Sequence, residues 1–444
     1  MPFTKAVVVN PPVPLKKGKV YPFVDMASVN PAARSVQESE HREFTGGGSR
    51  FVPGDTLMAR ITPCLENGKI ARFRPTDAAS AGFGSTEFIV IRGRDGLTDN
   101  DFAYYLTKWD EFRQFAVSQM AGTSGRQRVP AESLAHFTVA VPPLPVQRRI
   151  AAILGALDDK IELNRRMSRT LEEMARALFK SWFVDFEPVR AKMEGRWKKG
   201  QSLPGLPADL YDLFPDRLVD SELGEIPAGW KAGTVGDELI ELVSGARPKG
   251  GAVDNGVPSI GAENVIGLGR YDYSKEKFVP SGFFERLKLK GADVRPGDVL
   301  LYKDGAQIGR KAFFDRGFPH RECVINEHVF ILRCATSLMQ RYLFFWLDLP
   351  WMTSEIVALN SNSAQPGINQ AGVRKLPLLR PTAGIVNAFD RLVAPLTDSI
   401  FERCLESRTL AAIRDALLPK LLSGEIDVST LEGLIDEPAS VSTW

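Results

Sequence analysis

The chain repeats itself over a long distance, and this repeat constrains its fold more than any other feature. The tetrapeptide SRTL at residues 168–171 returns at residues 407–410, a separation of 239 residues. Upstream of each copy, PGDTL at residues 53–57 is echoed by PGDVL at residues 296–300, a separation of 243 residues. Loop deletions between two copies of one ancestral unit produce such a drift, whereas a solenoid would show several repeats of about 20 to 50 residues. The sequence therefore predicts two long copies, each with a globular part followed by a helical part.

The composition is that of an ordinary globular chain. A length of 444 residues allows two to four domains with separate cores. The net charge of +2, with 25% charged residues, means that any nucleic-acid surface must be local. The four cysteines lie far apart with no C-x-x-C pair, and the four histidines lack ligand spacing, which argues against a metal site. The sequence shows no signal-peptide pattern and no run of about 20 apolar residues, so we expect a cytoplasmic protein.

Both globular parts show a mixed pattern of strands and turns. In residues 1–145, β-branched runs at 7–9, 88–91 and 137–141 end at proline or glycine and are predicted to be strands. Residues 102–120 place aromatic and apolar side chains at helical spacing. Residues 226–385 repeat this character. The sequence therefore predicts two globular domains of mixed α/β (α+β) class.

A long helix is predicted after each globular part. Residues 146–183 contain no proline and a single glycine, Gly155. Their apolar residues alternate at spacings of 4 and 3 and form a heptad seam of nearly five repeats, in a helix roughly 55 Å long. A lone helix of this kind must bury its seam, and the second copy at about 386–422 supplies a partner in the same chain. Asn164 lies on the seam, where it is either a register-setting polar residue or a solvated position.

The helices also carry motifs that resemble a known family. PLPVQRRI at residues 143–150, LDDKIELN at 157–164 and ALFKSWFVDF at 177–186 resemble the central conserved region of the specificity subunits of type I restriction-modification systems. LLPKLLSGEI at 417–426 resembles the closing conserved region of that family. LGEIPAGW at 223–230 is similar to the segment that opens the second variable domain, and the N-terminus lacks its own version of this segment.

The resemblance, together with the proline- and glycine-rich composition after the first helix, predicts a division of the chain into six parts. These are target-recognition domain 1 (1–145), the central helix (146–185), an extended linker (186–225), target-recognition domain 2 (226–385), the distal helix (386–425) and a flexible tail (426–444). It implies that the two helices pack antiparallel as an intramolecular coiled coil with a pseudo-two-fold internal repeat. Each recognition domain would read one half of a split site on double-stranded DNA, which need not be palindromic.

The resemblance also implies partners and cofactors. The outer faces of the helices would dock two modification (methyltransferase) subunits, through which ATP-dependent restriction subunits join. S-adenosylmethionine, ATP and Mg²⁺ would be held by those partners, and none by this chain. Two alternatives stay open: the recognition subunit of a related two-subunit restriction system, and a non-DNA helical scaffold that joins two protein-binding domains. Salt-sensitive binding to duplex DNA would separate the scaffold from a DNA reader.

Candidate DNA contacts are basic and amide side chains at matching places in the two copies. Glycine-rich loops let the backbone approach phosphate, while arginine can pair bidentately with guanine, and glutamine or asparagine with adenine. For each residue, the alternative is a solvated polar group. The candidates are Arg60, Asn67, Lys69, Arg126, Gln127 and Arg128 in the first copy, and Lys303, Gln307, Arg310, Lys311, Gln365 and Asn369 in the second.

No catalytic motif withstands comparison with the chemistry it would need. NPPV at residues 10–13 is similar to the catalytic tetrad of amino-methyltransferases, but Val13 offers no aromatic face on which a flipped base could stack. Asp55, Glu66 and Lys69 suggest a nuclease site, but the second copy keeps no matching set of residues. The PGDxL motif is instead predicted to be a turn that leads into a buried strand. We therefore expect a non-catalytic chain.

Overall fold

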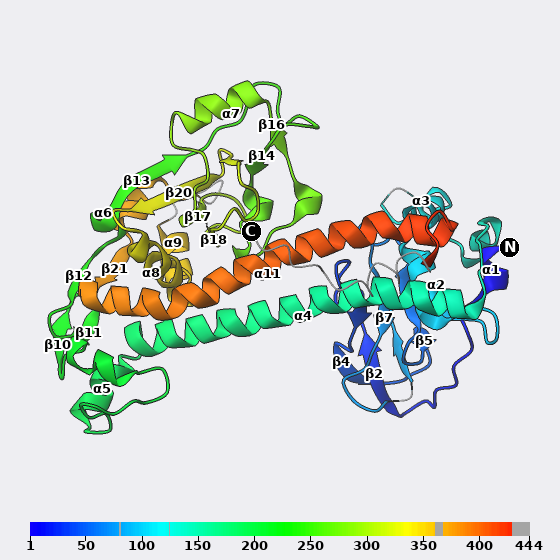
Figure 1. Ribbon diagram of the computed structural model, residues 1–444, viewed down its shortest axis with the longest axis horizontal. Coiled ribbons are helices and arrows are strands. Elements are labelled where there is room, and N and C mark those ends of the chain that lie inside the picture. Colours follow the sequence, from blue (N-terminus) through cyan, green and yellow to red (C-terminus); the bar gives the residue numbers. More distant parts are fainter. Residues whose placement is uncertain (80, 124, 360–366, 429–444) are drawn as a thin grey trace, which may run out of the picture. The chain divides into compact units, whose positions relative to one another are not determined.

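The computed structural model describes residues 1–79, 81–123, 125–359 and 367–428, which fall into two compact units (Figure 1). Unit 1 consists of Met1–Leu163 and the chain from Ser407 onward, and unit 2 is Asn164–Glu406. Each unit contains one part of both long helices. Among the helices in the described ranges, none is both long enough and apolar enough to cross a membrane.

Unit 1 is built on two small sheets. The first has the order β1-β9-β6-β7-β3, in which only β3 and β7 run parallel. The second has the order β4-β2-β8-β5, in which β2 and β8 run parallel. The strands are β1 (Val7–Val9), β2 (Val20–Val24), β3 (Ser35–Val36), β4 (Glu40–Glu43), β5 (Ser49–Phe51), β6 (Thr56–Ala59), β7 (Ile70–Phe73), β8 (Gly82–Gly84) and β9 (Phe88–Gly93).

Unit 2 repeats this arrangement. Its first sheet has the order β13-β20-β17-β18-β15, again with a parallel pair at the far edge, and its second has the order β16-β14-β19. The strands are β13 (Leu239–Ser244), β14 (Val257–Ile260), β15 (Gly267–Leu268), β16 (Phe278–Val279), β17 (Asp298–Tyr302), β18 (Lys311–Phe314), β19 (Val324–Ile325) and β20 (Val329–Cys334). The register also matches, since Met58 pairs with Ile70 in β6–β7 and Leu301 pairs with Lys311 in β17–β18. The long-range repeat in the sequence is therefore a repeat of fold.

The helix predicted at residues 102–120 is two helices in the structure, α2 (Asn100–Lys108) and α3 (Asp110–Ser118). The chain breaks at Trp109, whose backbone is extended, with φ of −62° and ψ of 129°. Asp99 begins α2 by accepting hydrogen bonds from the backbone N–H groups of Asp101 and Phe102. Unit 2 has the same pair, α8 (Ser337–Leu347) and α9 (Pro350–Ala358). Helical periodicity continues through such a break, which explains why the sequence pattern does not show it.

The predicted strand at residues 137–141 is also only partly correct. The segment forms an isolated bridge between Thr138 and Pro2, and Val139 exchanges two backbone hydrogen bonds with Met1. In unit 2 a regular two-stranded pair, β12 (Lys231–Thr234) with β21 (Pro377–Arg380), occurs just before the distal helix. The predicted strands at residues 7–9 and 88–91 are confirmed as β1 and β9.

The two long helices are confirmed, as α4 (Leu144–Phe183) and α11 (Ala383–Ser423). Every position of the predicted seam on α4 is buried or half-buried: Ile150, Leu154, Leu157, Ile161, Asn164, Ser168, Leu171, Ala175, Leu178 and Trp182. In unit 2 the helices run antiparallel (Figure 1), since Asn164 contacts Glu406 while Phe183 contacts Phe389. In unit 1, Leu154 shares a core with Leu418. The seam therefore packs on a helix of the same chain.

Asn164 is a buried seam residue, which rules out the solvated alternative. Its side chain is 1% exposed, and its Nδ2 donates a hydrogen bond to the Glu406 carboxylate at 2.8 Å. A polar pair at one level of an apolar seam favours a single register of the two helices, because any shift would bury an amide without this partner.

Residues 186–225 are more structured than the predicted extended linker. They form α5 (Glu187–Met193), a 3₁₀ helix η2 (Ala208–Leu213) and a hairpin of β10 (Leu218–Ser221) and β11 (Gly224–Pro227). Trp197 and Phe214 are buried, and the Phe214 ring packs edge-on against Trp182 of α4 at 5.0 Å between centroids. These aromatic residues bury enough apolar area to hold a segment that is rich in proline and glycine.

The remaining elements are short. They are α1 (Phe3–Ala6), η1 (Ala131–His136), α6 (Val235–Glu238), η3 (Ala262–Asn264), η4 (Tyr273–Lys275), α7 (Ser281–Lys288) and α10 (Gln370–Lys375). Most of the predicted tail lies outside the described residues. Its described part packs on the core of unit 1, where Val428 is 3% exposed.

The PGDxL motif forms a turn into a buried strand in both units, as predicted. Gly54 and Gly297 have φ of +91° and +85°, a backbone conformation that favours glycine. The aspartate after each glycine is buried and accepts two hydrogen bonds from an arginine on the neighbouring strand. Asp55 accepts them from Arg92 at 2.6 and 2.7 Å. The nuclease reading of Asp55 therefore fails, because its carboxylate is fully buried and ion-paired.

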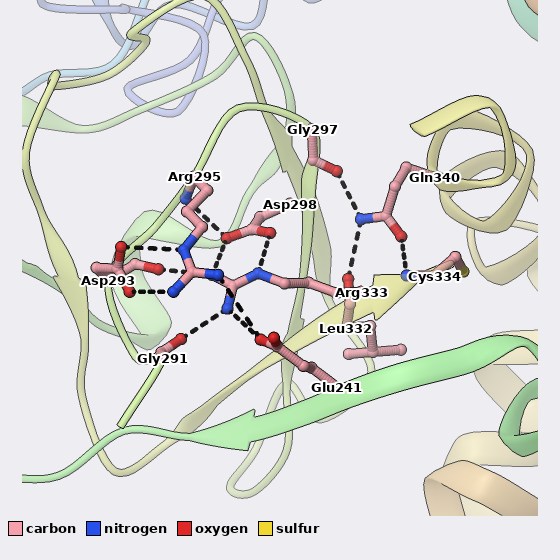
Figure 2. A network of polar contacts seen from close by, with 10 residues as sticks. All are labelled: Glu241, Gly291, Asp293, Arg295, Gly297, Asp298, Leu332, Arg333, Cys334 and Gln340. Carbon is pink, nitrogen blue, oxygen red and sulfur yellow. Dashed lines mark hydrogen bonds and ion pairs between the residues drawn. The ribbon is translucent and has the colours of Figure 1, made fainter. Parts of the chain in front are cut away.

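The matching network of unit 2 surrounds Arg333 (Figure 2). Asp298 accepts two hydrogen bonds from Arg333, both at 2.7 Å, and the backbone N–H of Arg295 donates a third at 2.8 Å. Gln340 of α8 donates to the Gly297 carbonyl at 2.7 Å and accepts from the Cys334 N–H at 2.6 Å. In unit 1, Asn100 of α2 makes the same two kinds of contact, with Gly54 and Gly93. In each unit this network ties the central strand to its neighbour and to a helix.

Each unit also has an ion-paired joint between its sheet domain and a long helix. Asp159 of α4 accepts from Arg34 at 3.2 Å in unit 1. Asp398 of α11 lies 239 residues later, pairs with Arg316 and accepts from Arg341 at 3.0 Å in unit 2. The helical part of the repeat therefore includes the residues that hold each domain to its helix.

Candidate nucleic-acid interface

The predicted DNA-contact segments of unit 1 meet at one edge of the first sheet, where β6 ends and β7 and β9 begin. The Arg60 N–H donates to the Glu87 carbonyl at 2.9 Å, and the Arg60 carbonyl accepts from the Val129 N–H at 2.8 Å. Arg128 forms an isolated bridge with Ile61. The loop that carries the candidate residues 126–128 is therefore fastened to the end of the central strand, and we call this place the reading edge.

Unit 2 builds its reading edge with the same backbone contacts. The Lys303 N–H donates to the His328 carbonyl at 3.0 Å, and the Lys303 carbonyl accepts from the Ile368 N–H at 2.8 Å. Asp304 forms an isolated bridge with Gly367. Lys303 thus occupies in unit 2 the place that Arg60 occupies in unit 1, and both residues stand at the same distance after PGDxL.

The candidate side chains of unit 1 differ in how open they are to a ligand. Asn67 and Arg126 are exposed, and Gln127 is half-buried. Lys69 donates its Nζ hydrogen bond to the Met26 carbonyl at 2.6 Å. Arg128 makes a bidentate ion pair with Glu87, which raises the pKa of Arg128 above its usual range. Asn67 and Arg126 are therefore the candidates best placed to contact an approaching ligand.

In unit 2, Lys311 is not at the surface. It lies in β18, is 5% exposed, and donates from its Nζ to the Thr353 hydroxyl at 2.6 Å. Burial lowers the pKa of Lys311 to about 8, an effect that the nearby Asp348 opposes. The prediction that Lys311 is a surface contact is therefore wrong. Side chains alternate between the two faces of a strand, and both faces of β18 are buried, so no side chain of this strand faces solvent.

The other candidates of unit 2 lie nearer to solvent. Gln307 is exposed and Arg310 is half-buried. The Lys303 Nζ lies 4.9 Å from the centroid of the Phe330 ring, a cation–π distance. Asn369 caps α10 by accepting from the Gly372 N–H at 2.9 Å, so its side chain has a structural use. Gln365 lies outside the described residues.

Glu87 and His328 are two residues of the reading edges that sequence reasoning missed. Glu87 stands directly before β9 and His328 directly before β20, and the His328 Nδ1–H donates a 2.7 Å hydrogen bond to the Asp304 carboxylate. Their separation of 241 residues, which Arg92 and Arg333 share, is the signal that could have identified them. Glu87 and His328 thus place a charged or titratable side chain on the residue next to Arg60 and next to Lys303, respectively.

Asn10, the first residue of the methyltransferase-like NPPV motif, has a structural role. The Asn10 side chain accepts from the Val90 N–H at 3.0 Å, and Asn10 has φ of 48°, so it ends β1 at the edge of the sheet. Within the described ranges, no three histidine, cysteine, aspartate or glutamate side chains gather where they could hold a metal ion.

Comparisons of sequence and of structure give relatives of the same kind. A family model described as type I restriction modification DNA specificity domain matches residues 14–173. The chain is similar to the type I restriction enzyme HindI specificity subunit of Haemophilus influenzae, with 26% identity over 87% of this chain and 90% of that protein. It is 25% identical to the MjaIX specificity subunit of Methanocaldococcus jannaschii, over 93% of this chain and 85% of that protein. Its fold resembles the crystal structure of a type I restriction-modification S subunit from M. genitalium, with a TM-score of 0.51, 14% identity and 95% coverage of both chains.

Proposed function

Because the chain belongs to the family of type I restriction-modification specificity subunits, we propose that it supplies the DNA sequence specificity of such a complex. Residues 1–145 and 226–385 are the two target-recognition domains. Each reads one half of a bipartite site on duplex DNA. The chain itself is non-catalytic.

The observation that carries this proposal is the duplicated reading edge. Arg60 and Lys303 occupy the same place and are held by the same pair of backbone hydrogen bonds. Side chains at matching positions differ, with Glu87 at one edge where His328 stands at the other. Two edges with the same backbone contacts but different side chains suit a target with two unlike halves, since base contacts depend on the donors and acceptors that each side chain offers.

The outer face of α4 supports the proposed docking of modification subunits. Leu163, Met167 and Met174 are exposed and recur at helical spacing away from the buried seam. On α11, Ile413 is exposed as well. Exposed apolar residues grouped on one helix face mark a surface that a protein partner covers. In the proposed complex, those partners hold S-adenosylmethionine, flip the target adenine and recruit ATP- and Mg²⁺-dependent restriction subunits, while this chain binds no cofactor.

A domain exchange and a point substitution test the proposal. The target is first identified by methylation-sensitive sequencing of DNA from cells that carry the complete system. Replacing residues 1–145 with the matching domain of a relative should change one half of that target and leave the other. Arg126→Ala should weaken discrimination within the same half by about 1–3 kcal/mol.

Arg74 provides the matched control for that substitution. It is exposed and follows the far end of β7, away from the reading edge. Arg74→Ala should leave the recognised sequence unchanged. The proposal fails if the chain shows no salt-sensitive binding to duplex DNA, or if the domain exchange changes both halves of the target.

A further inference from the structure

Unit 2 contains a cavity of about 690 Å³ beside its reading edge. Its walls are the second half of α4, the turn around β15, the turn that joins β17 to β18, and the junction of α8 and α9. Five basic and three acidic side chains line it, an excess of two positive charges. The β17–β18 turn that forms one wall begins at Lys303 of the reading edge.

Four of the charged lining residues are already paired with one another. Arg176 of α4 donates to Glu172 at 2.8 Å and forms an ion pair with Asp348. Glu172 also accepts from Arg270 at 2.8 Å. The buried Lys311 donates to Thr353. Because these groups satisfy one another, the interior does not call for a deeply bound ion or small molecule.

The rim of the cavity is formed by its remaining charged residues, Arg169, Arg310 and Glu173, which carry one excess positive charge. Arg169 of α4 is exposed, Arg310 of the β17–β18 turn is half-buried, and Gln307 of the same turn is exposed. Within the part of the chain that the structure describes, neither Arg169 nor Arg310 has an ion-pair partner. A guanidinium is a fork of donors that matches the oxygens of a phosphate group. Both guanidinium groups line the same opening, so the rim offers donors to a phosphate there, and a phosphodiester on a strand supplies such a phosphate.

We propose that the rim of this cavity binds a backbone phosphate of the target duplex through Arg169 and Arg310, without reading its sequence. The inference rests on the proposed function and deepens it, since it assigns a DNA contact to helix α4. A helix that both supports domain 2 and contacts the backbone fixes the position of the domain on the duplex. Phosphate contacts position a protein, whereas base contacts specify the sequence.

The matching turn of unit 1 is built differently. The sheet registers align Lys311 with Ile70 and therefore Arg310 with Lys69. The Lys69 ammonium already donates to the Met26 carbonyl. The Arg113 side chain lies over the matching turn of unit 1, since its Nη1 would be 2.9 Å from a Cβ built on Gly68. We therefore expect the phosphate contact beside the half-site of domain 2 alone.

The test is the salt dependence of DNA binding by the full chain, measured by fluorescence anisotropy with its identified target duplex. Each phosphate contact contributes about 0.9 to the slope of log K against log salt concentration. Because both side chains contact one phosphate, Arg169→Ala and Arg310→Ala should each lower that slope, and the double variant should lower it by about 0.9 in total. Both should weaken binding to target and unrelated duplexes by the same factor. Arg286→Ala, at an exposed position on α7 that lines no part of the cavity, is the matched control and should leave the slope unchanged.

The outcomes separate this inference from the proposed function. A wild-type chain without salt-dependent duplex binding contradicts the proposed function itself. Wild-type binding with unchanged slopes in both variants overturns the phosphate site alone, and so does a change in the bases that either variant prefers. Calorimetry with pyrophosphate is the second measurement. If pyrophosphate bound tightly, and the two substitutions abolished this binding without changing DNA binding, the rim would be a site for a small phosphate compound and not for DNA. Circular dichroism should show both variants folded, since neither substitution breaks an ion pair.

Discussion

Replacing Arg333 with methionine tests how much the buried aspartate–arginine network stabilises unit 2. Arg333 donates five hydrogen bonds, to Asp298, Glu241 and the carbonyls of Gly291 and Asp293, all at 2.7 to 2.8 Å. The methionine variant leaves the Asp298 carboxylate, which is 2% exposed, with the Arg295 N–H as its remaining donor in this network. Removing one partner of a buried ion pair costs about 3–5 kcal/mol, because the other charge stays buried and uncompensated.

A double variant provides the control. Asp298→Leu combined with Arg333→Met removes both charges and keeps apolar volume, so it should recover about half of the loss or more. Because the chain forms two units, global unfolding need not be two-state, and the free energy is better measured locally by hydrogen exchange at amides of β17 and β20. A cost below about 1 kcal/mol for Arg333→Met, or a double variant as unstable as the sum of its parts, would refute the reasoning.

Three further predictions concern burial and backbone geometry. Burial lowers the pKa of Lys311 from 10.5 to about 8. Between these pH values the unfolded chain binds more protons than the folded chain. The stability of unit 2 should therefore rise with pH across this window, by at most about 3 kcal/mol. Lys311→Met should remove this rise, which urea unfolding at several pH values would measure. Burial raises the pKa of Cys323 and of Cys334 to about 12. Mass spectrometry should therefore show that iodoacetamide at pH 8 labels neither cysteine in the folded chain and both cysteines in urea. Labelling in the folded chain would contradict their burial. A Cβ on Gly245 would lie 2.0 Å from the Ile325 carbonyl oxygen, so Gly245→Ala should lower the free energy of unfolding by about 3 kcal/mol. A Cβ on Gly282 of α7 would meet nothing within 4 Å, so Gly282→Ala should raise that free energy by about 0.5–1 kcal/mol. Equal thermal midpoints of the two variants would contradict both values.

Local features of the chain were predictable from the sequence, because their causes lie within a few residues. The heptad seam on α4 needs only a spacing of 3 and 4, and the PGDxL turn needs only a glycine at positive φ before an apolar run. The repeat made Lys303 a counterpart of Arg60, since equal distances after the same turn place both at the end of a central strand.

Tertiary structure decided what each polar side chain contacts. Nothing local to Lys311 shows that its strand is covered on both faces, so only the packed sheet reveals that this predicted contact points inward. The same holds for Asp55, whose partner Arg92 lies 37 residues away on a neighbouring strand. The segment around Trp197 folds against the helices because aromatic burial there outweighs the entropy of a chain rich in proline and glycine. Periodicity and turn chemistry fix which elements form, while strand pairing between distant residues fixes which side chains face solvent.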